Sequence, residues 1–173
     1  TTHVLDLQSS IGESVRNQNS SGATNGVSLT NSIFHDICAF SAIYISDVAR
    51  VYLKNIKAGE TIDPENVCHG TMKNVLQGVR ALSLMTITSS RAVIISNWTS
   101  ARTEMKVHLK YIAALAIEKS SFLDHADNIS HVASLLFDSV SFFSVENTRF
   151  ENNIGVPLSI TESYGIFEGC AFE

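Results

Sequence analysis

The densest group of side chains able to do chemistry lies in one short stretch, Asp124-His125-Ala126-Asp127, with His131 four residues further on. Two carboxylates and two imidazoles this close in sequence could act as a general acid and base, or could bind a metal ion. The stretch lies in the longest interval between apolar runs, where repeat proteins place functional insertions. Asp124, His125 and Asp127 are therefore the candidate catalytic residues.

The same stretch has an ordinary structural explanation. Asp124 stands two positions after a phenylalanine, and Asp36 and Asn152 stand in the same place after Phe34 and Phe150. Asp and Asn hydrogen-bond their own backbone in such turns. We prefer this explanation, so the sequence predicts no metal site and no cofactor, and it argues against an enzyme more than for one.

Modification is a second chemistry that the sequence suggests. Three N-x-[ST] sequons begin at Asn19, Asn97 and Asn128. They matter only if the chain is secreted in a eukaryote, where they would carry glycans on the surface. A chain so rich in Asn, Ser and Thr also produces sequons by chance.

The cysteines leave two alternatives open. Cys38, Cys68 and Cys170 cannot all pair within one chain. Buried free thiols that act as small apolar residues are the preferred interpretation. The other is one disulfide, or a bond to a residue outside these 173. No Cys/His spacing typical of a zinc site occurs.

Composition excludes several classes of protein. Of the 173 residues, 45% are hydrophobic and 17% are charged, which fits a folded domain and excludes a disordered chain. A formal net charge of −5 argues against a surface that binds nucleic acid. The longest apolar run, 111–117, is far shorter than the roughly 20 residues of a membrane span.

The elements that must position these residues follow a repeat of about 22 residues. Each unit has two short apolar runs whose anchors lie eight positions apart. The clearest anchor pairs are Ile45 with Leu53, Ile87 with Ile95, Leu109 with Ile117, and Phe137 with Val145. Val67 with Val75 is a poorer pair, and Ile160 with Ile166 or Phe167 is a compressed one. The first anchors thus fall at positions 45, 67, 87, 109, 137 and 160.

Within the runs, apolar residues alternate with period two, as at Ile43 and Ile45 or Val51 and Leu53. A helix would place them at every third and fourth position instead. The runs are also rich in Val, Ile, Phe and Thr, which favour strands. The sequence therefore predicts short strands throughout.

A six-residue frame follows the second run: apolar, polar, Asn or Gly, small, any, Phe. It fits 29–34, 117–122, 145–150 and 167–172, and it fits 53–58 with a smaller last residue. Asn and Gly tolerate the left-handed backbone of a sharp bend. The small residue and the Phe are expected to point inward. Trp98 breaks the phase by two, and we expect it to fill the core rather than to offer a platform for sugars.

No helix-length segment separates the strands, which excludes βαβ units. Only Asn25-Gly26 is a strong hairpin signal, which argues against an antiparallel sandwich. A solenoid remains, in which equivalent strands stack in parallel about 4.8 Å apart.

The frame and the three-strand unit resemble the right-handed parallel β-helix of the pectin-lyase-like superfamily over roughly residues 27–173. The expected fold is therefore all-β, a right-handed parallel β-helix (solenoid) of about six coils, each of roughly 20–28 residues. Residues 1–26 fit less well and are expected to be an irregular cap or loop. The resemblance also implies an asparagine ladder at the bend, formed by Asn31, Asn55 and Asn147, which Lys119 and Gly169 would interrupt.

Enzymes of that superfamily mostly act on acidic polysaccharides through clustered Asp along one sheet, whereas the acidic residues of this chain are scattered. We expect a structural or adhesive β-helix segment of an extracellular or cell-surface glycoprotein, with filament formation as one form of that role. The alternative is a polysaccharide lyase or hydrolase. A phage or viral fibre is a third candidate.

Residues 167–173 complete a repeat frame without a polar cap after it. An uncapped solenoid end exposes unpaired strand edges and apolar core. We therefore expect 27–173 to belong to a longer chain or an assembly. The expected partners are other subunits, or the rest of that chain, stacked on the open coil ends, with carbohydrate as a further candidate.

Overall fold

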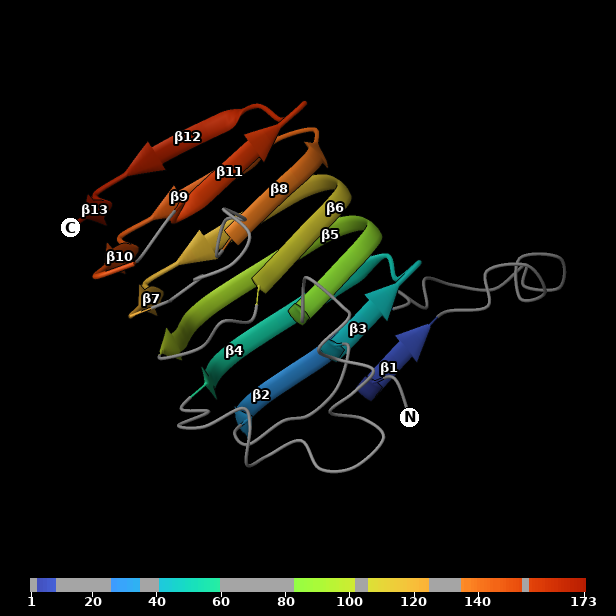
Figure 1. The fold of residues 1–173 in the computed structure, drawn as a ribbon. Helices are drawn as coiled ribbons and strands as arrows, with labels where there is room; N and C mark the ends of the chain where they lie inside the picture. The colour runs from blue at the N-terminus through green and yellow to red at the C-terminus, as the bar shows by residue number, and fades with distance from the viewer. Residues whose placement is uncertain are drawn as a thin grey trace, which may run out of the picture.

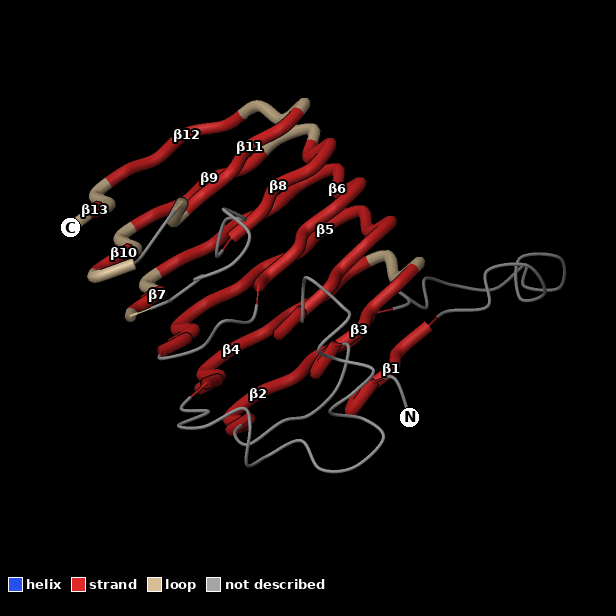
Figure 2. The backbone as a smooth tube through the Cα atoms, in the orientation of Figure 1, coloured by secondary structure: helices blue, strands red, loops and turns tan. Residues whose placement is uncertain are grey.

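The computed structural model describes residues 3–8, 26–34, 41–59, 83–101, 106–124, 135–153 and 156–173. These residues form strands joined by short turns, and the strands pair in parallel to build a β-solenoid (Figure 1). Figure 2 shows the described strands following one another around successive turns of the solenoid. The prediction of an all-β parallel solenoid is confirmed. Within these ranges, no helix is long and apolar enough to cross a membrane.

The strands form three stacks along the solenoid. Stack 1 contains β1 (His3–Gln8), β3 (Ser41–Ser46), the first part of β5 (Ser83–Ala101), the first part of β6 (Lys106–Glu118), β8 (Leu135–Val140) and β11 (Leu158–Thr161). Stack 2 contains β2 (Gly26–Phe34), β4 (Arg50–Gly59), the later parts of β5 and β6, β9 (Phe143–Glu146) and β12 (Gly165–Glu168). Stack 3 contains the ends of β2, β4 and β5, then β7 (Ser121–Leu123), β10 (Arg149–Glu151) and β13 (Ala171–Phe172).

Four segments of equal length pass once through all three stacks: 41–59, 83–101, 106–124 and 135–153. In segment 83–101 the whole turn is the single strand β5, of 19 residues. Segment 156–173 extends the stacks at one end, and β1 and β2 extend them at the other. The paired anchors Ile87 and Leu109, Leu109 and Phe137, and Phe137 and Ile160 are 22, 28 and 23 positions apart, so the register confirms these predicted intervals.

One predicted unit does not lie in the stack. Ile45 pairs directly with Ile87, and Leu53 pairs directly with Ile95. No strand can therefore lie between turns 41–59 and 83–101, and the predicted unit at Val67 is wrong as an intervening coil. Val67 falls in 60–82, outside the described residues.

At the other end of the stack, β1 lies within 1–26, the segment expected to be irregular. It pairs Leu7 with Ile45 in parallel register. The stack therefore begins before residue 27.

The core is a continuous column of apolar side chains inside the solenoid, because alternate residues of each strand point inward. The sequence anchors line it. Those of stack 1 are Ile45, Ile87, Leu109 and Phe137, those of stack 2 are Leu53, Ile95, Ile117 and Val145, and all are at most 1% exposed.

The chain bends at residues with left-handed backbone, and these fall in columns. One column follows stack 1 and contains Asp47, Ser89, Tyr111, Ser139 and Glu162, with φ from 48° to 58°. A second separates stacks 2 and 3 and contains Asn31, Asn55, Asn97, Lys119, Asn147 and Gly169, with φ from 48° to 61°. Asn, Asp and Gly adopt this conformation most readily. Tyr111 is the bulky exception.

The inward positions of the bend frame are filled as predicted. Ser120 and Phe122 are both 1% exposed. The Ser120 hydroxyl donates to the Glu118 carbonyl at 2.9 Å, which satisfies the buried polar group. The ring of Phe150 lies between those of Phe122 and Phe172, with centroids 5.2 and 4.7 Å apart and planes within 8° of parallel.

Trp98 is in phase with this frame, which corrects the predicted shift of two residues. It pairs with Ile56, and Ser100 pairs with Ala58. Trp98 therefore takes the place of the small residue, and Ser100 takes the place of Phe. The large and small members have exchanged positions, so the volume inside the bend is still filled. Trp98 is 1% exposed, which confirms the prediction that it fills the core.

Candidate functional site

The structure describes only part of the cluster singled out from the sequence. Asp124 is exposed, has a φ of 51°, and its backbone N–H donates to the Glu151 carbonyl at 3.0 Å. Its backbone thus forms a bend, as the turn explanation predicts. His125, Asp127 and His131 lie outside the described residues. Among the residues that are described, no three His, Cys, Asp or Glu side chains gather closely enough to hold a metal ion.

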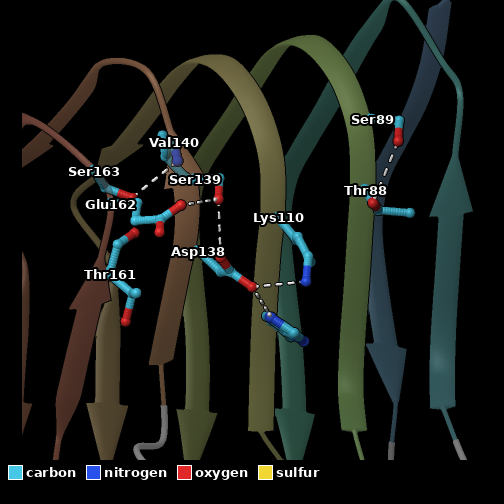
Figure 3. Close-up of polar contacts among 10 residues, drawn as sticks. Thr88, Ser89, Lys110, Asp138, Ser139, Val140, Thr161, Glu162 and Ser163 are labelled. Atoms are coloured by element: carbon cyan, nitrogen blue, oxygen red, sulfur yellow. Dashed lines mark hydrogen bonds and ion pairs between the residues drawn. The ribbon is translucent and has the colours of Figure 1, made fainter.

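A different polar cluster lies on the outer face of stack 1 (Figure 3). The parallel register pairs Lys110 of β6 with Asp138 of β8. The Lys110 ammonium lies 2.8 Å from Asp138 Oδ2, and His108 Nε2 lies 4.0 Å from the same oxygen. His108 and Lys110 are two positions apart in β6, so both project outward towards this carboxylate.

A hydroxyl links this ion pair to a second carboxylate. Ser139 Oγ lies 3.0 Å from Asp138 Oδ1 and 3.3 Å from Glu162 Oε2, and its single proton can be donated to either oxygen. Ser139 and Glu162 occupy successive turns of the left-handed column. We call these five residues, His108, Lys110, Asp138, Ser139 and Glu162, the stack 1 cluster.

Charges within the stack 1 cluster are set by its contacts. Hydrogen bonds from Lys110 and then Ser139 lower the pKa of Asp138, which keeps it ionised at neutral pH. Hydrogen bonds to Asp138 and then Tyr111 raise the pKa of Lys110. Burial lowers the pKa of His108, partly opposed by the Asp138 charge, so the imidazole is neutral at pH 7.

Tyr111 borders the cluster in an uncommon backbone conformation. Its φ is 53°, its side chain is 56% exposed, and Lys110 Nζ lies 4.6 Å from its ring centroid. A bulky residue in the left-handed region carries strain that its surroundings must offset. The cation–π contact with Lys110 supplies part of that compensation.

This arrangement can bind a polar ligand and can accept a proton. The side chains of His108, Lys110 and Asp138 are each about one third exposed, so a ligand can reach them. Asp138 is a poor proton donor at neutral pH because its pKa is lowered, whereas neutral His108 can act as a base. A carboxylate, an ammonium and an imidazole together suit a ligand with several hydroxyl or carboxyl groups.

The stack 1 cluster was not predicted from the sequence, because its members come from separate turns. The register pairs Asp138 with Lys110 and Thr161. A usable signal was present, since Lys110 and Asp138 each follow a first anchor by one residue. Equal offsets from equivalent anchors place two side chains next to each other on one face.

Asparagines of the second left-handed column bond to one another. Asn55 Nδ2 donates to Asn31 Oδ1 at 2.8 Å, and Asn97 Nδ2 donates to Asn55 Oδ1 at 2.9 Å. Asn97 also begins a sequon, so a single side chain serves the ladder and is the acceptor position for a glycan. The other two sequons, at Asn19 and Asn128, lie outside the described residues.

Asn147 occupies the same column, but its neighbours there are Lys119 and Gly169. Gly169 has no side chain, and a Cβ at this position would lie 2.7 Å from Asn147 Oδ1. The asparagine amide thus lies directly against the glycine.

Of the cysteines, Cys170 is described. It is a free thiol that donates to the Val145 carbonyl at 3.3 Å. It takes the small position of the bend frame, where other turns have Ser120 or Thr148. Cys38 and Cys68 lie outside the described residues.

Comparison with known proteins adds no relative. No protein-family model, curated protein or solved structure matches this chain. The parallel β-solenoid is therefore established by the strand register alone.

Proposed function

We propose that this chain is a structural or adhesive β-helix segment of an extracellular or cell-surface glycoprotein, in which further coils cover its last turn. The observation that carries the proposal is the exposure of segment 156–173. Ile160, Phe167 and Phe172 occupy inward columns, yet they are 40%, 38% and 52% exposed. Their partners in the preceding turn are at most 1% exposed: Phe137, Val145 and Phe150.

The pairing of the last strands favours a further β-solenoid coil as the cover of segment 156–173. In the part of the chain that is described, β11, β12 and β13 pair on one side only. A strand edge beside an apolar face is a template for another strand. A further coil would pair the edge and bury the three side chains in one step.

We further infer membership of the right-handed, pectin-lyase-like β-helices. The bonded amides of Asn31, Asn55 and Asn97 and the stacked rings of Phe122 and Phe150 support this inference. The sequons at Asn19, Asn97 and Asn128 support a glycosylated, extracellular protein.

Hydroxyl-radical footprinting tests the covered end. The oxidation of Phe167 and Phe172 would be compared between the 173-residue chain alone and the assembled form in which the protein occurs. We expect strong protection of both rings in the assembly, and unchanged oxidation of Tyr111, which is exposed on the side of the solenoid. Equal oxidation of the two phenylalanines in both samples would refute the proposal. Glycopeptide mapping of the same material tests the three sequons.

A second candidate function is a polysaccharide lyase or hydrolase, and the stack 1 cluster is the observation that favours it. Its residues would be Asp138 and His108 rather than Asp124, His125 and Asp127. Turnover of polygalacturonate by Asp138→Asn and by Asp124→Asn would be compared with that of the parent. Loss in the first variant alone supports an enzyme at the cluster, and a parent without turnover removes this candidate for that polymer.

A further inference from the structure

Formal charge changes steadily along the described part of the solenoid. Counting Lys and Arg against Asp and Glu, turn 41–59 carries +2, and turns 83–101 and 106–124 carry +1 each. Turn 135–153 carries −2, and 156–173 carries −3, from three Glu and no Lys or Arg. Strand β1, which lies beyond turn 41–59 in stack 1, carries Asp6, so 3–8, 26–34 and 41–59 together carry +1 against −3 for 156–173. The described residues at the two ends thus differ in the sign of their net charge.

The charges lie on the surface around each end. Glu162, Glu168 and Glu173 are exposed around the apolar last turn. At the other end, Arg50, Lys54 and Lys57 are exposed on β4. Among the described strands, only β2 lies beyond β4 in stack 2, and it has no charged residue.

The first described turn is also incompletely covered. Leu29 is only partly buried, whereas its pairing partner Leu53 is 1% exposed. Phe34 is likewise partly buried and belongs to the same inward column as Phe172. The first and last turns thus present the same columns of apolar side chains, in the same strand direction.

We propose that copies of this chain stack head to tail, with 156–173 of one copy against β1 and β2 of the next. This inference rests on the proposed function and names the partner of its exposed end. Phe34 of the second copy would continue the Phe122–Phe150–Phe172 column, and Leu29 would cover Phe167. The strand edges of 156–173 in one copy and of β1 and β2 in the next would then pair in parallel, as adjacent turns do inside the solenoid.

Charge decides between this arrangement and its alternative. A face-to-face dimer would bring two sets of Glu162, Glu168 and Glu173 together, and like charges at a contact are unfavourable. Head-to-tail stacking instead brings Glu168 towards Lys54 of the same column, and the acidic turn towards an end whose described residues carry a net charge of +1. Two strand spacings, about 10 Å, separate these charges, which is one Debye length at about 0.1 M salt. The contact is heterologous and does not close, so it continues as a filament.

A charge-swap experiment on the 173-residue chain tests the proposal. Sedimentation velocity at low salt would follow the parent, Glu162→Lys/Glu168→Lys, and Lys54→Glu/Lys57→Glu. We expect the parent to form a concentration-dependent series of oligomers that salt weakens. Each double variant alone should associate at least about tenfold more weakly, because its two ends then carry like charge. An equal mixture of the two variants should recover association, because every contact between unlike chains is again attractive.

Two control variants change the net charge in interior turns, and so separate the effect of charge at the ends of the stack from the effect of net charge. Glu118→Lys reverses a charge in the column of Glu168, but in an interior turn. Arg91→Glu reverses a basic charge in another interior turn, 83–101. Both should leave association unchanged. Phe172→Asp should abolish it by removing the apolar contact, with circular dichroism confirming that each variant is folded.

Two results would overturn the inference. One is a parent that stays monomeric at all concentrations and salt conditions. The other is a dimer that Lys54→Glu/Lys57→Glu does not affect, which would indicate face-to-face association. Protection of Phe172 in the native assembly together with a monomeric chain would leave the proposed function standing and remove this inference alone.

Discussion

Turns 106–124 and 156–173 place side chains in the same inward columns, but these side chains are buried in the first turn and largely exposed in the second. Phe122 and Phe172 hold the same position of the bend frame, yet one is 1% exposed and the other is 52% exposed. The residue type is thus set by the column, whereas its burial depends on a neighbouring turn on each side. In a solenoid, stability is a sum over contacts between adjacent turns, so an end turn has about half of them.

The largest expected difference concerns the phenylalanine column. Phe150→Ala should lower the free energy of unfolding by about 3–5 kcal/mol, because a large cavity remains between two rings. Phe172→Ala should cost far less, since half of that ring is already in water. Urea denaturation of the monomeric chain measures both. Equal losses would mean that the last turn is covered within the chain itself.

The exchange of large and small residues at Trp98 and Ser100 allows a sharper test. Trp98→Ser should cost about 3–5 kcal/mol in unfolding free energy, as other aromatic truncations do in a core. Adding Ser100→Phe restores the frame seen at Ser120 and Phe122 and should recover at least half of that loss. A double-mutant cycle measures the coupling. Additive effects of the two substitutions would show that they do not share one space.

In the asparagine column we expect a smaller difference in unfolding free energy, between Asn55→Ala and Asn147→Ala. Asn55 both donates to Asn31 and accepts from Asn97, so Asn55→Ala removes two hydrogen bonds and a residue suited to left-handed backbone. We expect a loss of about 2 kcal/mol in unfolding free energy. Asn147→Ala, between Lys119 and Gly169, should cost about half as much. Thermal denaturation compares the two, and an equal or larger loss at Asn147 would contradict the ladder.

The smallest effect is the pH dependence of the stack 1 cluster. The pKa of His108 is lower in the folded chain than its ordinary value of 6.5. The unfolded chain therefore binds a proton first as the pH falls below 6.5, and folding stability should decrease from there down to the folded pKa. His108→Asn should flatten the melting temperature between pH 7 and pH 5. An unchanged slope in this variant would assign the dependence to other groups.

Asp138 acts over a lower pH range with the same sign. Its pKa is lowered by Lys110, so its contribution is fully present above the ordinary pKa of 3.8 and is lost as the pH falls through the folded value. Comparing Asp138→Asn with His108→Asn in one pH series therefore separates the two residues.

Much of the fold could be predicted because the solenoid repeats its chemistry. The anchors at Ile45, Ile87 and Leu109 were identified from spacing alone, and each lies in the core. The inward Ser and Phe of the bend frame were predicted in the same way. Val67 misled because an apolar residue at the expected interval does not show that a further turn is present there, and Ile45 pairs directly with Ile87.

The candidate site was harder to predict because its residues come from three turns. Lys110, Asp138 and Glu162 are unremarkable in sequence, and only the strand register brings them together. Trp98 posed a related problem, since a volume exchanged between two positions resembles a shift in phase.

Hydrogen exchange of the isolated chain, kept monomeric by Phe172→Asp, tests the central claim most directly. The claim is that each turn is protected by its neighbours on both sides. Backbone amides of stack 2 in turn 106–124 should exchange at least about a hundredfold more slowly than those of β12, whose strand has one paired side among the described residues. Equal protection of the two turns would contradict the account.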